Sequence, residues 1–155
     1  MGISGSEVDV VNAIPILIVD DDVEDVQFIK RAFAKNKVDN PLFTVFSGEE
    51  AIEFLHRCNR NVAPYPGLIL LDLNMPGVGG METLRQIRAK EDWRHIPIII
   101  FTTSKAHEDV VQSYTLGANS FVSKPFSLDE LVKVVAKISD FWFQVAALPE
   151  SIQEY

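Results

Sequence analysis

The stretch LILLDLNMPGVGG, from Leu68 to Gly80, decides the fold of this chain of 155 residues. It opens with an apolar run, Asp72 follows that run directly, and a loop rich in Pro and Gly comes next. A short apolar run without polar alternation is typical of a parallel strand that is covered on both faces. The carboxylate of Asp72 therefore marks the point at which a buried strand ends and the chain leaves the core.

Other strand-length segments accompany this one, and helical segments alternate with them. Continuous apolar runs occur at 14–19 and 96–101, and weaker strands are predicted at 42–46 and 120–122. Apolar periodicity predicts helices at about 23–37, 48–57, 81–91 and 108–116, and a capping-box spacing starts a last helix that runs from 127 to about 145. These βα units predict an α/β fold, namely a doubly wound five-stranded parallel sheet with five helices in a three-layer sandwich. The strand order that we expect is 2-1-3-4-5, as in flavodoxin-like folds.

Composition is that of an ordinary globular protein with one domain. Hydrophobic residues make up 47% of the chain and charged residues 23%, and no window approaches the roughly 18 apolar residues of a membrane span. The formal net charge of -8 argues against nonspecific nucleic-acid binding, because phosphate contacts need clustered Lys and Arg. We therefore expect a cytoplasmic protein that has protein partners and binds neither nucleic acid nor membrane.

The predicted organisation is a flexible N-terminal tail at 1–13, a single domain at 14–147 with an extended C-terminal helix, and a C-terminal tail at 148–155. The lone cysteine, Cys58, cannot form an internal disulfide, and no neighbouring thiol or histidine pattern indicates a metal. We interpret it as a small buried hydrophobe on a helix. The scattered residues His56, His95 and His107 are interpreted as structural or surface residues.

Polar side chains follow the ends of the predicted strands. The first strand ends in residues 20–22, all Asp, the third in Asp72, the fourth in Thr102 and Thr103, and the fifth in Lys124. In a doubly wound sheet, ligands bind at the carboxyl ends of the strands, where the strand order reverses. If the first and third strands are neighbours, their terminal acids meet in one crevice. Lys124 alone is also compatible with a surface turn, and Thr102 alone with a strand filler, but the whole set favours a site.

Carboxylates that share a crevice raise one another's pKa unless a cation neutralises them. Mg²⁺ prefers carboxylate, water and phosphate oxygens, and no thiol or imidazole competes here, so Mg²⁺ is favoured over Zn²⁺. With the metal bound, Asp72 can act as a nucleophile that takes a phosphoryl group as an acyl phosphate. Lys124 and a Thr hydroxyl would then stabilise the transferring oxygens.

Further acids follow the first strand and have simpler interpretations. Glu24 and Asp25 are interpreted as favourable charges at a helix N-terminus. Asp22 either caps that helix or lends charge to the site. The sequence alone leaves both interpretations of Asp22 open.

At these residues the sequence closely resembles the receiver domains of two-component response regulators, over residues 14–143. The motifs ILIVDDD, LILLDLNMPGVGG, IIIFTTSKA and LGANSFVSKPF, with their spacing, carry the resemblance. It implies that Asp20 and Asp21 are the metal-binding acidic pair and that Asp72 is the phosphoacceptor and a metal ligand. It also implies that the backbone carbonyl of Asn74 completes the metal site.

The same resemblance assigns the residues that would turn phosphorylation into a signal. Thr102 matches the family's switch hydroxyl, and Lys124 matches its phosphate-binding lysine, whose bond to the following proline is usually cis. Phe121 occupies the aromatic switch position, which is often Tyr, and Gly79 stands where the family often has Asp, a change expected to affect loop stiffness. We expect Thr102 to move toward the phosphate and Phe121 to fill the vacated space, which changes the surface near the fifth strand.

The predicted last helix carries two apolar stripes, although one is enough to dock a helix on a sheet. A second stripe exposes a patch of the kind that marks interfaces. The segment DFWFQVAALP resembles the C-terminal extension of single-domain regulators that partner phytochrome-type histidine kinases and are commonly dimers. We therefore predict a homodimer through this helix; the alternative is that the tail folds back and covers the patch. The predicted interface residues are Leu131, Val134, Val135, Ile138, Phe141, Trp142 and Val145.

The leading functional hypothesis is a stand-alone response regulator that takes a phosphoryl group from a histidine kinase, such as a phytochrome-type kinase, and acts through protein contacts rather than as an enzyme. A Mg²⁺-dependent phosphohydrolase with an aspartyl nucleophile is an alternative, but the position of its second acid holds Asn74, and no cap domain is predicted. A flavodoxin-type cofactor binder is another. It would need a phosphate-cradling loop rich in Gly, Ser and Thr after the first strand, where this chain has acids.

Overall fold

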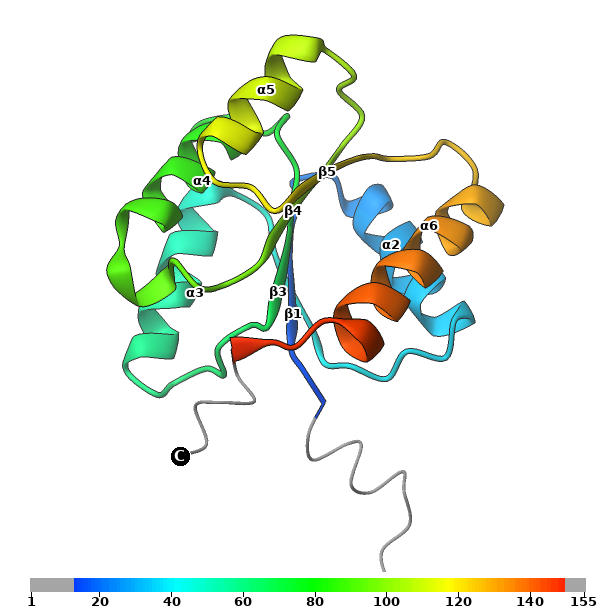
Figure 1. Cartoon of the computed structure of the whole chain (residues 1–155), viewed down its shortest axis with the longest axis horizontal. Coiled ribbons are helices and arrows are strands. Elements are labelled where there is room, and N and C mark those ends of the chain that lie inside the picture. Colours follow the sequence, from blue (N-terminus) through cyan, green and yellow to red (C-terminus); the bar gives the residue numbers. More distant parts are fainter. Residues whose placement is uncertain (1–12, 150–155) are drawn as a thin grey trace, which may run out of the picture.

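The computed structural model describes residues 13–149 and contains one parallel sheet (Figure 1). The strands are β1 (Ile16–Val19), β2 (Leu42–Val45), β3 (Leu68–Leu71), β4 (Ile98–Thr102) and β5 (Ser120–Ser123). Their order is β2-β1-β3-β4-β5, and all neighbours are parallel. The predicted fold class and strand order are confirmed.

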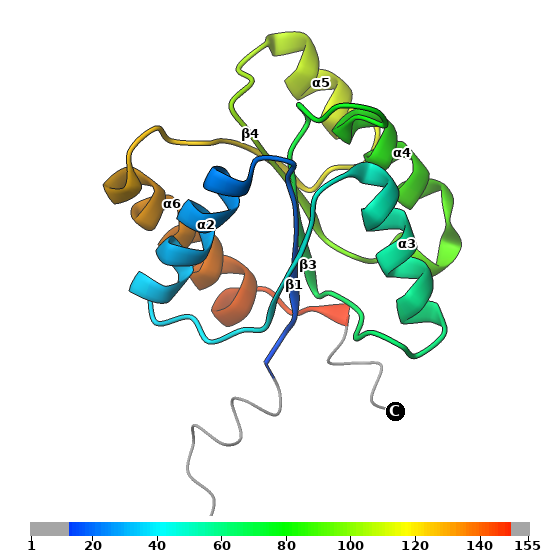
Figure 2. The ribbon, with the colours of Figure 1, turned by 180° about the vertical axis from the view of Figure 1, so that it is seen from behind.

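Helices cover both faces of this sheet. They are α2 (Val23–Lys35), α3 (Gly48–Asn59), α4 (Gly80–Ala89), α5 (His107–Thr115) and α6 (Leu128–Asp140). A 3₁₀ turn η1 (Glu91–Trp93) follows α4, and a π-helical turn η2 (Phe141–Val145) continues α6. Figures 1 and 2 show α2 and α6 on one face of the sheet, with α3, α4 and α5 on the other.

The central strands β1 and β3 are continuous apolar runs because each contributes side chains to two cores. Successive side chains of a strand point to opposite faces of the sheet. In β1, Leu17 and Val19 belong to the core that includes Leu55 of α3, whereas Ile16 and Ile18 belong to the core that includes Phe33 of α2. Both faces of the central strands are therefore buried, and only the strand ends are free to carry polar groups.

Part of the predicted dimer interface lies on the inner stripe of α6, the apolar side that faces the sheet. Leu131, Val135 and Ile138 are buried in the core that α6 shares with α2, so their assignment to a dimer interface is wrong. Ser127 caps this helix by accepting a hydrogen bond from the Glu130 N–H, 3.2 Å away, as the capping-box spacing predicts. Phe141 is 51% exposed and Val145 is 72% exposed, whereas Val134 and Trp142 are half-buried against the same core.

The predicted tails fall mostly at 1–12 and 150–155, outside the described residues. Leu148 belongs to the predicted C-terminal tail, yet it is buried. Figure 1 shows the chain after η2 turning back toward the amino ends of the strands. The segment after α6 thus packs on the domain, although Phe141 and Val145 stay exposed.

Cys58 is buried on α3, as predicted, and its thiol donates a hydrogen bond to the Pro64 carbonyl oxygen over 3.2 Å. Burial raises the pKa of this thiol to about 11. Within residues 13–149, no helix is both long enough and apolar enough to span a membrane.

Candidate functional site

The first and third strands bring their terminal acids to the same level of the sheet. Val19 of β1 pairs with Leu71 of β3, so Asp20 and Asp72 leave neighbouring strands side by side. Both are buried, while Asp21 is not. Asp20, Asp21 and Asp72 each offer a carboxylate oxygen, and these oxygens all lie within 4.8 Å of one another. The structure therefore brings the predicted metal-binding acids together.

The turn that starts α2 orients this acidic segment. The Asp22 carboxylate accepts hydrogen bonds from the N–H groups of Glu24, at 2.9 Å, and Asp25, at 3.3 Å. Asp22 is thus the N-cap of α2, which decides between the two interpretations that the sequence left open. The Asp22 N–H in turn donates to Asp20 Oδ1 over 2.9 Å and so orients the Asp20 carboxylate.

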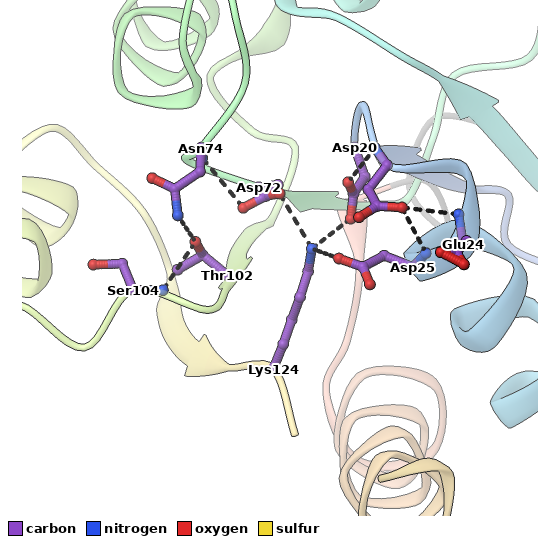
Figure 3. A network of polar contacts seen from close by, with 9 residues as sticks. Asp20, Glu24, Asp25, Asp72, Asn74, Thr102, Ser104 and Lys124 are labelled. Carbon is purple, nitrogen blue, oxygen red and sulfur yellow. Dashed lines mark hydrogen bonds and ion pairs between the residues drawn. The ribbon is translucent and has the colours of Figure 1, made fainter. Parts of the chain in front are cut away.

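Lys124 reaches the centre of the acidic cluster from the end of β5 (Figure 3). Its Nζ atom donates to Asp20 Oδ2 at 2.5 Å, Asp25 Oδ2 at 3.0 Å and Asp72 Oδ2 at 3.1 Å. The Lys124 backbone N–H donates to the Thr102 carbonyl oxygen over 2.7 Å, which ties the lysine to the end of β4. A buried ammonium with three donors is thereby fully paired with carboxylates.

Burial and pairing act in opposite directions on the pKa values of Asp20 and Lys124. Burial raises the pKa of Asp20 to about 6, and the hydrogen bond from Lys124 opposes this only in part. Burial lowers the pKa of Lys124, but the hydrogen bond and charge of Asp20, with Asp72 and Asp25, outweigh burial and raise it above its ordinary value. Lys124 is therefore a permanent cation in this site at neutral pH.

A chain of polar contacts links Asp72 to the predicted switch residue. The Asn74 N–H donates to Asp72 Oδ1 at 3.3 Å, and Asn74 Nδ2 donates to Thr102 Oγ1 at 3.4 Å. Thr102 is fully buried, and its Oγ1 also accepts from the Ser104 N–H at 3.3 Å. Asn74 thus bridges Asp72, through its backbone N–H, and the Thr102 hydroxyl, through its side-chain amide, a link that the sequence interpretation did not foresee.

Phe121, the predicted aromatic switch residue, lies on β5 and is half-buried. It packs against the core beneath α3 and α4. Its backbone N–H donates to the phenolic oxygen of Tyr114 on α5 over 3.1 Å. The phenol comes from a neighbouring helix, so a hydroxyl lies beside this position although Phe121 itself has none.

Two sequence expectations need correction here. Residues 13–149 contain no cis peptide bond, so the Lys124–Pro125 bond is trans and the expected cis bond is wrong. Trans is favoured before proline by only about 0.5–1 kcal/mol. The surrounding structure can therefore select either isomer, and the local sequence does not decide between them. The second is incomplete: Asp25 lies in the first turn of α2, as its interpretation as a helix N-terminal charge requires, but its carboxylate also contacts Lys124. In the sequence, the signal for this contact is the position of Asp25 in the first helical turn after residues 20–22.

A cavity of about 470 Å³ opens beside these groups. Asp21, Asp25, Asp72 and Lys124 contribute polar lining, and Phe28 and Phe126 belong to its apolar side. The acidic cluster fits a hard dication, because its donors are carboxylate oxygens and it contains neither thiol nor imidazole. The geometry therefore suits a divalent cation next to a carboxylate that a phosphorylated donor can approach.

Comparison with known proteins gives the same picture. A family model for the response regulator receiver domain matches residues 16–136. The chain is 35% identical over 135 residues to "Response regulator Rcp1" of Synechocystis sp., which covers 86% of this chain and 92% of Rcp1.

Solved structures agree with the fold, and one of them holds a divalent cation. The crystal structure of the phosphorylated cyanobacterial phytochrome response regulator RcpA matches with a TM-score of 0.82 and 34% identity, covering 88% of this chain and 99% of that one. The Mn²⁺-bound form of Rcp1 matches with a TM-score of 0.79 and 34% identity, covering 88% of this chain and 99% of that one. This chain has an acidic cluster that could hold a metal ion, and its structural relative Rcp1 has been crystallised with a divalent cation bound.

Proposed function

This chain belongs to the response regulator receiver family, and we propose that it is a stand-alone phosphoacceptor of two-component signalling. Asp72 accepts a phosphoryl group from a histidine kinase in a Mg²⁺-dependent reaction. The resulting conformational change alters the contacts of the protein with other proteins. The observation that carries this proposal is the position of Asp72 between the acids Asp20 and Asp21 and the ammonium of Lys124.

The chain's own residues orient the reacting groups and offset the negative charge on the phosphoryl oxygens. A carboxylate oxygen of Asp72 attacks phosphorus, the new O–P bond forms, and the P–N bond of the phosphohistidine breaks with its electron pair leaving on the imidazole. Lys124, already 3.1 Å from Asp72 Oδ2, donates to a phosphoryl oxygen. When held by Asp20, Asp21, Asp72 and the Asn74 carbonyl, Mg²⁺ supplies positive charge beside the transferring oxygens.

The route from phosphate to signal runs through β4 and β5. Thr102 Oγ1 is already bridged to Asp72 by Asn74, so a phosphoryl group on Asp72 competes for the Thr102 hydroxyl. Movement of Thr102 leaves space that the half-buried ring of Phe121 can enter. A shift of the β5 backbone at Phe121 also acts on the hydrogen bond from its N–H to Tyr114 of α5, which carries the change to the surface.

Partners follow from the relatives and from the exposed residues. RcpA is described as a phytochrome response regulator, so we propose a phytochrome-type histidine kinase as the donor in the cytoplasm. We also propose a homodimer through the outer face of α6 and η2, supported by the exposure of Phe141 and Val145 beside the half-buried Val134 and Trp142. These residues replace the larger interface expected from the sequence.

The alternative enzyme function finds less support. A phosphohydrolase needs a general acid near its aspartyl nucleophile, but Asn74 occupies that position and its amide binds Thr102. We therefore propose that the protein catalyses only its own phosphorylation and dephosphorylation. For a flavodoxin-type binder, the acids at the end of β1 would repel a bound phosphate.

Incubation with acetyl phosphate and Mg²⁺, followed by intact mass measurement, tests the proposal. We expect one added phosphoryl group that hydroxylamine removes, and none in Asp72→Ala. Asp92→Ala, which removes an exposed acid on η1, should label like the wild type. Labelling of Asp72→Ala would refute the assignment, and steady release of phosphate without a stable adduct would favour the hydrolase.

A further inference from the structure

We infer that Asp25 is a positioning residue that retains the Lys124 ammonium in the site when a divalent cation claims Asp20. The inference rests on the proposed function, because it takes Asp20, Asp21 and Asp72 as the metal ligands. It assigns to the first turn of α2 a role in metal binding that acts through Lys124 rather than by direct coordination.

The geometry separates Asp25 from the other carboxylates around Lys124. Lys124 Nζ contacts Asp20, Asp25 and Asp72, but only Asp20 and Asp72 belong to the group whose oxygens lie within 4.8 Å of one another (Figure 3). The Lys124 side chain is 7% exposed, whereas that of Asp25 is 36% exposed. Asp25 therefore contacts the buried ammonium from the rim of the cluster.

The position of Asp25 at the rim matters because a bound dication and the Lys124 ammonium compete for the same carboxylates. A dication bound to Asp20 and Asp72 draws on the same two carboxylates that now accept from Lys124, and the two cations repel each other. A buried ammonium that loses its carboxylate partners is costly. Asp25 is the contacting carboxylate outside the metal group, so it can keep its hydrogen bond to Lys124 while Asp20 turns to the metal.

The backbone holds Asp25 where this exchange requires it. The Asp25 N–H donates to Asp22 Oδ1 over 3.3 Å, inside the capped first turn of α2. The same turn follows directly on Asp20, so the metal-binding acid and the retaining acid are parts of one rigid segment. Without Asp25, binding of a cation would leave Lys124 sharing its remaining partners with the metal, and the affinity for that cation would fall.

Isothermal titration with Mg²⁺ tests this role on the full chain. We expect Asp25→Asn to raise the dissociation constant about fivefold or more, and Asp25→Glu to restore much of the loss. Glu24→Gln is the matched control, because Glu24 lies in the same turn, is exposed, and is not among the carboxylates that Lys124 contacts in the described structure. That control should change the constant less than about twofold.

A double-substitution cycle shows whether Asp25 acts through Lys124. In a Lys124→Met background, Asp25→Asn should change the Mg²⁺ dissociation constant less than about twofold. An equal loss in both backgrounds, or equal effects of Asp25→Asn and Glu24→Gln, would overturn the inference. If Lys124→Met does not fold, failure of Asp25→Glu to restore affinity overturns it instead. A wild-type chain that binds no Mg²⁺ would overturn the proposed function itself, and this inference with it.

Discussion

The carbonyl oxygen of Asp72 lies so close to Gly80 that a Cβ atom on Gly80 would be 2.0 Å from it. The Gly80 N–H also donates to the Leu73 carbonyl oxygen over 3.1 Å, which closes the loop after β3 onto the start of α4. The absence of a side chain at Gly80 therefore allows the backbone of Asp72, the proposed phosphoacceptor, to pack directly against the start of α4. Its neighbour Gly79 has no such contact, since a Cβ there would lie 3.7 Å from the nearest atom.

This contrast predicts opposite effects for two adjacent substitutions. Gly80→Ala should lower the free energy of unfolding by about 3 kcal/mol, because backbone atoms must move to admit the methyl group. It should also slow labelling by acetyl phosphate, since Asp72 moves with them. Gly79→Ala should leave the stability equal or raise it by about 0.5 kcal/mol. Urea denaturation measures both, and equal midpoints for the two variants would contradict the packing argument.

The same position predicts a gain from restoring the family's acid. Gly79 is the N-cap of α4 and offers no side-chain hydrogen bond to the first turn. Gly79→Asp should be more stable than Gly79→Ala by about 1 kcal/mol, because a carboxylate can accept from the free N–H groups. Thermal unfolding of the pair isolates the cap from the loss of glycine flexibility. A less stable Asp variant would indicate that nearby carbonyl oxygens repel the carboxylate.

The switch predicts a coupled movement of Thr102 and Phe121. In crystals with beryllofluoride and Mg²⁺, the Phe121 ring should turn inward relative to crystals of the free protein. Thr102→Val keeps the shape of the side chain but removes its hydroxyl, so in this variant the ring should keep its free position. An identical Phe121 rotamer in free and beryllofluoride-bound wild-type crystals would refute the switch.

The proposed homodimer predicts that substituting one exposed apolar residue of its interface changes the oligomeric state. Val145→Ser should shift the protein toward the monomer in light scattering at micromolar concentration, because Val145 is 72% exposed on the proposed interface. Val62→Ser, on the loop after α3, changes a residue that is 67% exposed and should leave the mass unchanged. A monomeric wild type, with and without beryllofluoride, would refute the interface.

The raised pKa of the Cys58 thiol predicts that the protein loses stability at alkaline pH. Its pKa is raised to about 11 in the folded state from 9.0, so between these values the unfolded chain releases a proton that the folded chain keeps. The free energy of unfolding should therefore fall as pH rises through this window, by at most about 1.4 kcal/mol per pH unit. Denaturation at pH 8 and pH 10, compared with Cys58→Ala, isolates the effect. An equal pH dependence in both proteins would show that the thiol does not titrate this way.

Local patterns were sufficient for the sheet and for the main site residues. The central strands are short apolar runs, and parallel strands end at one edge, so Asp72, Thr102 and Lys124 could be placed at that edge from the sequence. The identity of the N-cap at Asp22 could not be decided in this way, because an acid after a strand suits both a cap and a metal site. It depended on where the Asp22 side chain points, toward the Glu24 N–H.

The sequence by itself determined the fold class and the edge at which the polar residues gather, because these depend on periodicity and on where each apolar run ends. Only the tertiary structure decided which groups touch across the chain. It paired Asp25 with Lys124, 99 positions apart, bridged Asp72 to Thr102 through Asn74, and buried the inner stripe of α6. Such contacts depend on the packing of whole elements against one another, which no local pattern encodes.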